Sequence, residues 1–490
     1  MPVKGEFKKL LTLPSGMQVA ILPFEKKSRI YMWLCLKTGS LDGFIPVRTS
    51  IPDDAITCKA TWQGKPITLV YHPGLDHAVE HQIFKGTSDR KYGNPYRVNK
   101  YYGPRNRDDE DAQGADTQEM AVRYYIETEP EELEESFRFL SALTLRSLLT
   151  QQNPQVQRRL QREWEREKEI ILTERGYYED DTELVAREET QSRMFPKHPL
   201  WYSIDGTEED IRSITLAQIA LRYKTRYHPS NMLLIVIGGG VTPALIKKLS
   251  QKYFRSPHHR VLHIPSVIPN IIQSIPAKDR IKFIPKDREL LHICLGFPYT
   301  RPTTPTSEQL PASIRKHHSI AVLKKVLGGR WTSRTATELR EKRGIGYRHH
   351  SFRSDYPGAG SLLYSTFTFP KKSRQWQGVF LRILRKLATE LIPELEFADA
   401  KASLIDDLEA ATETPGDLAE FIFTSVRRTN RVPMFEEVKA EIRAVTREDV
   451  LAASQAIICP ERLYATFVGP LPSEKDQRAI FRALKNWKLK

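Results

Sequence analysis

The chain has 490 residues, with 75 Lys and Arg against 60 Asp and Glu, which gives a formal net charge of +15. At about 100–200 residues per domain this length predicts two to four domains, and 40% hydrophobic residues exclude a chain that is disordered throughout. No two cysteines form a CxxC pair, which excludes a disulfide framework and a cysteine-based zinc site. We therefore expect a reducing compartment: the cytoplasm or, alternatively, the mitochondrial matrix.

The positive charge is not concentrated in one segment. Runs such as residues 158–163 mix both signs, as solvated helix faces do, and this pattern argues against a nucleic-acid partner. The sequence contains no run of 18 or more apolar residues, so we expect no membrane span. The apolar run near the N-terminus is too short for the core of a signal peptide.

Strand and helix signals alternate along the first part of the chain. They predict, in chain order, a hairpin at 8–24, a strand at 30–38, helices at 131–150 and 154–178, and a strand at 231–237. Prolines punctuate the next stretch and predict a linker at 255–280. Regular structure is expected again at 281–298, 317–328, 362–369, 374–393, 435–457 and 462–468.

An internal repeat divides the chain into two halves. Thr215, Pro229 and Gly238 match Thr446, Pro460 and Gly469 at a constant offset of 231 residues. In both segments the pattern predicts a helix, a proline turn and an apolar strand. We expect two domains of similar α+β fold, at 1–254 and 281–490.

The strongest chemical signal is the segment His77-Ala78-Val79-Glu80-His81. Residues four apart share one face of a helix, so His77 and His81 can bind one metal ion. Glu80 can stand beside that metal without ligating it, which is the inverted HxxEH arrangement of zinc peptidases. There a carboxylate takes a proton from a water activated by the metal. The alternative interpretation is an amphipathic helix with two surface histidines.

A catalytic zinc needs a third protein ligand and an open position. Glu167 and Glu174 lie seven residues apart on the long charged helix and share a face. Ile170, Ile171 and Leu172 between them predict partial burial, and a buried carboxylate needs a cation or a donor. Glu174 is the predicted third ligand, and Glu167 is predicted to orient a ligand or the water. Glu163, Glu165 and Glu169 are interpreted as solvated.

The sequence resembles the pitrilysin/insulinase family of zinc metallopeptidases, and most of all its two-domain, processing-peptidase-like subfamily. The resemblance extends from about residue 8 to residue 470. It implies that Glu174 is the zinc ligand of the second zinc segment and Glu167 its assisting glutamate. The matching segments are GLDHAVEHQIFKGT at 74–87, EKEIILTERGYYEDD at 167–181, HPLWYSIDGTEEDIRSIT at 198–215 and YHPSNMLLIVIGG at 227–239.

The second half resembles the family as well, through LGGRWTSRTATELREKRGIGY at 327–347. The resemblance implies that Arg340 and Tyr347 contact the substrate at the zinc site, where such groups can stabilise an oxyanion. The alternative is a core tyrosine and a surface arginine. The family fold is α+β, with two homologous domains that each pair a mainly antiparallel sheet with helices and together form half of a clamshell.

The sequence departs from the family pattern in three places. Two apparent insertions, 51–70 and 88–113, are predicted to form surface loops. In GADTQEMAVRYY at 114–125, Gln118 and Glu119 stand where the family has Asn-Ala on the edge strand that receives the substrate. Contacts to the substrate backbone are expected to differ there.

Together these features predict a Zn²⁺-dependent endopeptidase that cleaves extended peptides or unfolded polypeptide segments. His77, His81 and Glu174 would hold the metal, with Glu80 as the base. The resemblance implies a homodimer, or a heterodimer with a metal-less partner, because family members of this length assemble the site from two chains. The alternative from another class is a non-catalytic or assembly subunit of a peptidase-like complex.

Overall fold

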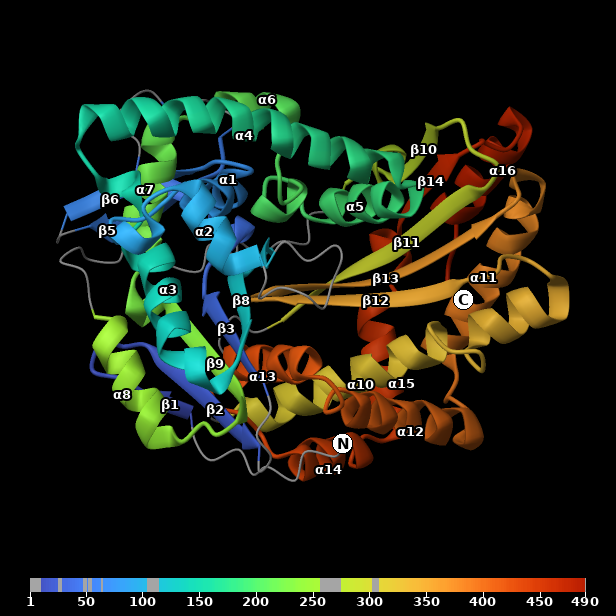
Figure 1. Ribbon diagram of the computed structural model, residues 1–490. Helices are drawn as coiled ribbons and strands as arrows, with labels where there is room; N and C mark the ends of the chain where they lie inside the picture. Colours follow the sequence, from blue (N-terminus) through green and yellow to red (C-terminus); the bar gives the residue numbers. More distant parts are fainter. Residues whose placement is uncertain are drawn as a thin grey trace. The chain divides into compact units, whose positions relative to one another are not determined.

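The computed structural model describes residues 10–24, 29–46, 51, 55–62, 65–103, 114–255, 275–301 and 308–489. The chain forms two compact units, whose arrangement along the chain is drawn in Figure 1. The first unit comprises Met1–Glu174, Tyr202–Pro265 and Glu409–Met434. The second comprises Arg175–Trp201, Ser266–Leu408 and Phe435–Lys490.

The first unit is built on a six-stranded sheet in the order β1-β2-β9-β3-β8-β7. Its neighbouring strands run antiparallel except β2 and β9, which are parallel. The central strand β9 reads MLLIVIGG and is buried along its whole length, as a strand covered on both faces should be. The strands are β1 (Leu10–Thr12), β2 (Gln18–Phe24), β3 (Ile30–Leu36), β7 (Ala115–Thr117), β8 (Val122–Thr128) and β9 (Met232–Gly239).

Amphipathic helices supply the rest of the first unit's core. Residues of α1, α3, α7 and α8 join the sheet in one hydrophobic cluster that includes Trp164 of α4. The helices are α1 (Leu75–Ile83), α2 (Pro95–Tyr102), α3 (Leu133–Leu145), α4 (Pro154–Asp180, which continues into the second unit), α6 (Glu208–Ser213), α7 (Leu216–Arg226), α8 (Pro243–Tyr253) and α13 (Pro415–Thr429).

The second unit repeats this plan with a five-stranded sheet in the order β10-β14-β11-β13-β12. Again one pair, β10 and β14, is parallel and the others are antiparallel. The strands are β10 (Ile281–Pro285), β11 (Leu291–Thr300), β12 (His349–Tyr356), β13 (Ala359–Thr368) and β14 (Tyr464–Gly469). The helices are α5 (Thr182–Met194), α9 (Ala277–Arg280), α10 (Leu310–Leu327), α11 (Ser373–Thr389), α12 (Glu394–Ala410), α14 (Phe435–Arg443), α15 (Arg447–Ile457) and α16 (Glu474–Lys485). The predicted α+β fold class is confirmed.

The repeat seen in the sequence has a structural counterpart. Thr215 and Thr446 both cap their helices with a reciprocal capping box, and Pro229 and Pro460 both open a short 3₁₀ turn. Each turn leads into the strand that makes the parallel pair of its sheet, β9 with β2 and β14 with β10. The spacing is therefore kept because both copies build the same helix–turn–strand unit.

One helix from each half packs on the sheet of the other. α5 packs against β11, β13 and β14 of the second unit, and α13 packs against β3 and β9 of the first (Figure 1). The two compact units therefore interleave in sequence. The domain bounds 1–254 and 281–490 describe the repeated halves of the sequence and stay a prediction. Residues 256–274 of the predicted linker lie outside the described residues.

The two insertions are more ordered than the sequence predicts. In 51–70, β5 (Thr57–Trp62) and β6 (Lys65–Tyr71) pair with β4 (Phe44–Pro46) in a small antiparallel sheet. In the described part of 88–113, Val98 and Tyr102 of α2 are buried in the first unit's core. The prediction of surface loops was wrong for these parts, because apolar positions spaced for a strand and a helix were read as polar insertions.

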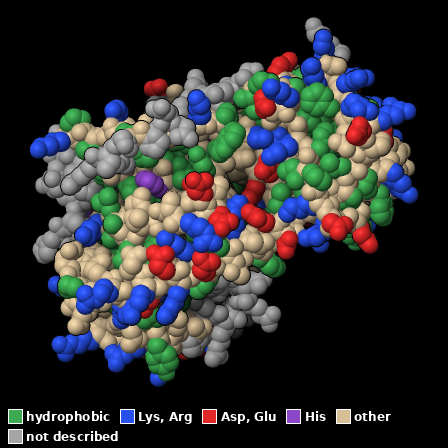
Figure 2. Space-filling view, turned by 90° about the horizontal axis from the view of Figure 1, so that it is seen from above, with side chains coloured by type: hydrophobic (Ala, Val, Ile, Leu, Met, Phe, Trp, Pro, Cys, Tyr) green, Lys and Arg blue, Asp and Glu red, His purple; other side chains and the backbone are tan. Residues whose placement is uncertain are grey.

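The charged side chains are distributed over the surface, as the sequence predicts. On the face drawn in Figure 2, Lys and Arg side chains are scattered with Asp and Glu among them. Within the described residues, no helix is both long enough and apolar enough to cross a membrane.

Equivalent glycines lie at the ends of the two repeated strands, β9 and β14. We predict that they are equally intolerant of a side chain. Gly238 and Gly469 have positive φ, and an added Cβ would lie 2.6 and 2.5 Å from the carbonyl oxygens of Arg29 and Leu290. Replacing either by alanine should lower the free energy of unfolding by about 1–3 kcal/mol. The measurement is urea unfolding followed by circular dichroism.

The helical Gly378 is the matched control. A Cβ there meets only the end of the Arg382 side chain, at 4.0 Å, so Gly378→Ala should stabilise by about 0.5–1 kcal/mol. Wild-type stability in both strand variants would contradict the predicted intolerance, and a loss in only one of them would contradict the equivalence.

Candidate metal centre

Helix α1 is held in place by contacts that involve no metal. It begins after Gly74, whose left-handed backbone (φ 76°) allows an approach that would put a Cβ 2.2 Å from the carbonyl oxygen of Asp205. Asp76 in its first turn accepts two hydrogen bonds of 2.9 Å from Arg222 of α7, and both side chains are buried. A buried ion pair of this geometry is costly to break, so it holds α1 in one position.

The structure brings together the three predicted metal ligands. The Nε2 atoms of His77 and His81, one turn apart on α1, lie 3.1 Å from each other. Glu174 Oε2, on α4, lies 3.8 Å from the first nitrogen and 3.6 Å from the second. Among the described residues, these three are the His, Cys, Asp or Glu side chains that form a possible metal-binding group, with their ligand atoms all within 4.8 Å of one another.

These residues fit a tetrahedral zinc ion. Two nitrogens bound at about 2.0–2.1 Å in tetrahedral geometry are separated by about 3.3–3.4 Å, close to the spacing of the two imidazoles. Glu174 Oε2 is buried and makes no hydrogen bond, which is costly unless a cation compensates it. The donor set of two neutral imidazoles and one carboxylate is that of hydrolytic zinc sites, with a fourth position left open.

Two further carboxylates hold the other nitrogens of the imidazoles. Glu167 Oε2 lies 3.0 Å from His81 Nδ1, and its second oxygen pairs with Lys85 Nζ at 2.6 Å. Asp205 Oδ1 lies 2.8 Å from His77 Nδ1. Each carboxylate can accept a hydrogen bond from the Nδ1–H group of its imidazole. This keeps the proton on Nδ1, leaves Nε2 free to ligate and fixes the ring orientation.

Glu80 faces the same space but is held differently. It is 6% exposed, and its Oε2 accepts a hydrogen bond of 3.1 Å from the Thr117 hydroxyl and lies 4.0 Å from His77 Nε2. Burial raises the pKa of Glu80. A carboxylate with a raised pKa, held beside the ligand nitrogens, has the properties of a general base.

Acidic groups dominate the electrostatics of this cluster. Burial opposes the charged form of His81, but its hydrogen bond with Glu167 and the nearby carboxylate of Glu174 prevail and raise its pKa to about 10. The carboxylates around the ring therefore favour positive charge at this point.

The edge strand beside the cluster is anchored from the far end of the sequence. Arg123 of β8 pairs with Asp116 of β7 through two hydrogen bonds and with Glu420 of α13. Its guanidinium also stacks on the ring of Trp33, 5.0 Å from the centroid. The strand that carries Thr117 is thereby held against the sheet.

The strand also lies differently from the sequence-based expectation. β7 covers Ala115–Thr117, whereas Gln118 and Glu119 follow it and accept backbone hydrogen bonds from Ser40 and Leu41. The expected departure at Gln118 and Glu119 therefore falls in the turn after the edge strand rather than on the strand itself.

Sequence reasoning missed Asp205 and Thr117. Both lie in segments that resemble the family, 198–215 and 114–125. Their contacts with α1 join residues 128 and 37 positions apart, and no periodicity reports such contacts. The available signal for each was that a polar residue stands inside a segment that resembles the family.

Arg340 and Tyr347 lie in the second unit. Arg340 belongs to a six-residue π-helix, Ala336–Glu341, a conformation that is rare and frequent at functional sites. Its guanidinium carbon stacks over the ring of Tyr347, 4.7 Å from the centroid, and over that of Trp331 at 3.8 Å. The two predicted substrate-contacting residues thus touch each other.

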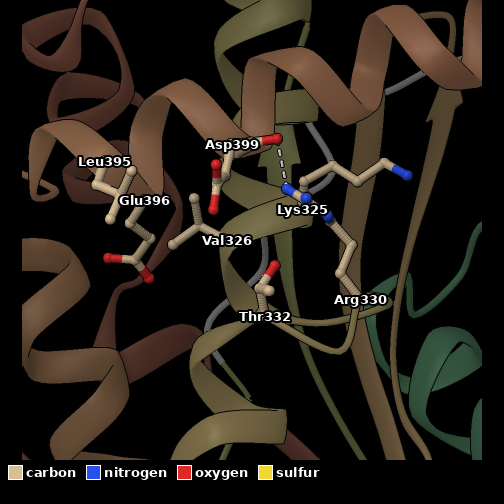
Figure 3. A pocket seen from close by; sticks show the side chains of 8 residues that line it. Lys325, Val326, Arg330, Thr332, Leu395, Glu396 and Asp399 are labelled. Atoms are coloured by element: carbon tan, nitrogen blue, oxygen red, sulfur yellow. Dashed lines mark hydrogen bonds between the residues drawn. The ribbon is translucent and has the colours of Figure 1, made fainter.

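Three histidines of the second unit, outside this cluster, have partners of their own. His317 pairs with Asp355, His318 with Glu441, and His349 Nδ1 with the Tyr364 hydroxyl. A small cavity of about 140 Å³ lies between the end of α10 and α12 (Figure 3). Basic and acidic side chains share its lining, which includes Lys325, Arg330, Thr332, Leu395, Glu396 and Asp399.

Comparison with known families matches residues 213–404 to a model described as "Peptidase M16 inactive domain". That segment contains none of the three clustered ligands. Among curated relatives, an uncharacterized zinc protease of Mycobacterium leprae is 24% identical over 481 residues, 97% of this chain and 94% of the relative. An uncharacterized zinc protease of Bacillus subtilis is 22% identical over 404 residues, 82% and 90% of the two chains.

Solved structures share the fold over nearly the whole chain. An M16-like peptidase from Alicyclobacillus acidocaldarius has a TM-score of 0.75 at 20% identity, covering 96% of this chain and all of the other. A protease from Helicobacter pylori has a TM-score of 0.70 with the same identity and coverage. The chain thus shares the fold of these peptidases, and together with the relatives named zinc proteases this confirms its resemblance to the pitrilysin-like family.

We predict that Asp205 strengthens metal binding although it is not a ligand. Asp205→Ala removes the acceptor for His77 Nδ1 and should weaken zinc binding about 10–100-fold. The affinity is measured by competition with a chromophoric chelator. Glu165→Ala, which removes an exposed carboxylate from α4, is the control and should keep wild-type affinity. Equal affinities in all three proteins would refute the role of Asp205.

Proposed function

We propose that the chain is a zinc-dependent endopeptidase that cleaves extended peptides or unfolded polypeptide segments. The observation that carries the proposal is the convergence of His77, His81 and Glu174 with Glu80 directly beside them. The relatives named zinc proteases support it. A metal site with two imidazoles, one carboxylate and an adjacent carboxylate that does not ligate the metal suits metal-assisted hydrolysis.

When bound, zinc would supply a water whose pKa is lowered towards about 7. Glu80 accepts the proton of that water and later returns it to the leaving amine. Thr117 holds the carboxylate of Glu80 in position through its hydroxyl. Glu167 and Asp205 keep the ligand imidazoles oriented, so the proton acceptor and the ligands are set before substrate binds.

The substrate would bind as an additional strand. β7 lies at the end of its sheet and, within the described residues, pairs only with β8. An extended peptide can use such an edge through main-chain hydrogen bonds, which selects for unfolded segments. Arg340 and Tyr347 would bind substrate carbonyls and stabilise the developing oxyanion.

This proposal includes a homodimer, in which one chain supplies the metal site and the other Arg340 and Tyr347. A heterodimer with a metal-less partner is the variant of the same idea. The cytoplasmic location, with the mitochondrial matrix as alternative, stays a prediction.

The competing function is a non-catalytic or assembly subunit. The match to an inactive-domain model favours it, as does the likeness to a peptidase M16 inactive domain from Pseudomonas fluorescens, with a TM-score of 0.68 at 16% identity. The matched segment, however, omits the metal cluster, and His77, His81, Glu80 and Glu174 are all present. We therefore favour the enzyme.

Glu80→Gln separates metal binding from catalysis. We expect it to retain one zinc per chain and to lose about 10²–10⁴-fold in kcat, because glutamine cannot accept a proton. Zinc is measured by atomic absorption, and cleavage with a library of unstructured peptides. Removal of zinc by a chelator should abolish cleavage, and added zinc should restore it. A wild type that binds no zinc would refute the enzyme.

Thr117→Val tests the orientation of the base. It keeps the side-chain shape but removes the hydroxyl that donates to Glu80, so kcat/KM should fall about 3–10-fold, the equivalent of a hydrogen bond of about 0.5–1.5 kcal/mol. Thr117→Ser keeps the donor and should retain most activity. If the valine and serine variants behave alike, the hydroxyl does not position Glu80.

A further inference from the structure

The loop before the π-helix exposes a large aromatic side chain. Trp331 is 66% exposed, although burying an indole is normally favourable. Its ring covers one face of the Arg340 guanidinium, whose carbon lies 3.8 Å from the ring centroid. Tyr347, itself 60% exposed, covers the same guanidinium at 4.7 Å. Two exposed rings therefore stack on one cation.

The backbone around these rings is built for the arrangement. Gly329 has a positive φ of 92° directly before Arg330 and Trp331. Gly346, before Tyr347, has a φ of 73°, and an added Cβ would lie 2.8 Å from the Thr366 hydroxyl. Beneath that glycine the buried His349 bonds Tyr364. Glycines and a buried polar pair thus fix where both rings emerge.

The stacking leaves hydrogen-bonding capacity on Arg340 unused. Its Nε pairs with Glu341 at 3.4 Å, and neither terminal nitrogen donates to any residue that the structure describes. Stacked arginines keep their in-plane N–H groups available for a carbonyl or carboxylate. A ligand bound there must lie next to the indole of Trp331, because that ring covers the guanidinium.

The neighbours of Trp331 extend this surface. Arg330 and Thr332, on either side of it in the chain, line the cavity of about 140 Å³, together with Leu395, which is 77% exposed (Figure 3). Within this unit, a cavity and the exposed apolar side chain of Leu395 therefore adjoin the loop that carries Trp331.

We propose that Trp331 is a specificity-determining residue, which selects peptides with a large apolar or aromatic side chain beside the carbonyl that Arg340 binds. The inference rests on the proposed function, in which Arg340 contacts the peptide. The indole orients the guanidinium through one face and offers its exposed surface to the substrate side chain. Exposed tryptophan and arginine are the residue types that dominate binding in such surfaces.

The test measures binding separately from cleavage. Fluorescein-labelled unstructured peptides, identical except for Phe, Leu or Ala at successive positions, are titrated against zinc-loaded Glu80→Gln by anisotropy. At one position we expect Phe and Leu peptides to bind about 5–10-fold more tightly than the Ala peptide. Adding Trp331→Ala should abolish that preference, and Trp331→Phe should retain most of it.

Trp201→Ala, which removes another exposed tryptophan of the same unit, is the matched control and should keep the preference. In kinetics on the otherwise unmodified chain, Trp331→Ala should lower kcat/KM for the Phe peptide by the same factor relative to kcat/KM for the Ala peptide. An equal loss for Phe and Ala peptides, or no loss at all, would overturn the inference. Absence of cleavage with the binding preference intact would overturn the proposed function instead.

Discussion

Carboxylates packed around two imidazoles are the constraint on which the candidate centre depends. Glu80, Glu167, Glu174 and Asp205 surround His77 and His81, while Lys85 is a cation paired within the group. Partly buried negative charge of this density needs positive charge nearby. A divalent cation would supply it at the point where both Nε2 atoms meet the Glu174 oxygen that makes no hydrogen bond, and the surrounding fold holds these groups in place.

The scaffold draws on distant parts of the chain. Asp76 and Arg222 fix α1 on α7, and Glu420, from the chain's last hundred residues, anchors Arg123 and through it the edge strand. Because α13 belongs to the first unit by its packing, the strand that holds Thr117 against Glu80 relies on residues from the second half of the sequence. Truncation at the predicted linker would remove that support.

The sequence predicts local constraints well and long-range ones poorly. The four-residue spacing of His77 and His81 and the seven-residue spacing of Glu167 and Glu174 place each pair on one helix face, and the structure has them there. Asp205 and Thr117 escaped because their partners are fixed by how loops and an edge strand fold back onto α1. The insertion at 51–70 was misread for a different reason: β5 and β6 are neighbours in the sequence and pair with each other, but their strand pattern was taken for a polar loop.

The two repeated sheets show how similar frameworks come to carry different chemistry. Each unit has a strand that pairs antiparallel with the repeated strand, β3 with β9 and β11 with β14. The next α-helix along the chain is α1 in the first unit, after β4, β5 and β6, and α10 in the second. On α1 two histidines stand four apart and converge, whereas on α10 His317 and His318 are adjacent, point to different partners and pair with Asp355 and Glu441. Adjacent residues cannot share a helix face, so α10 cannot reproduce the metal pair. The second unit has instead a π-helix that presents Arg340 between two exposed rings. Spacing on a single helix thus separates the unit that can assemble a metal cluster from the unit that cannot. Under the proposed function, the first would activate water and the second would bind the peptide.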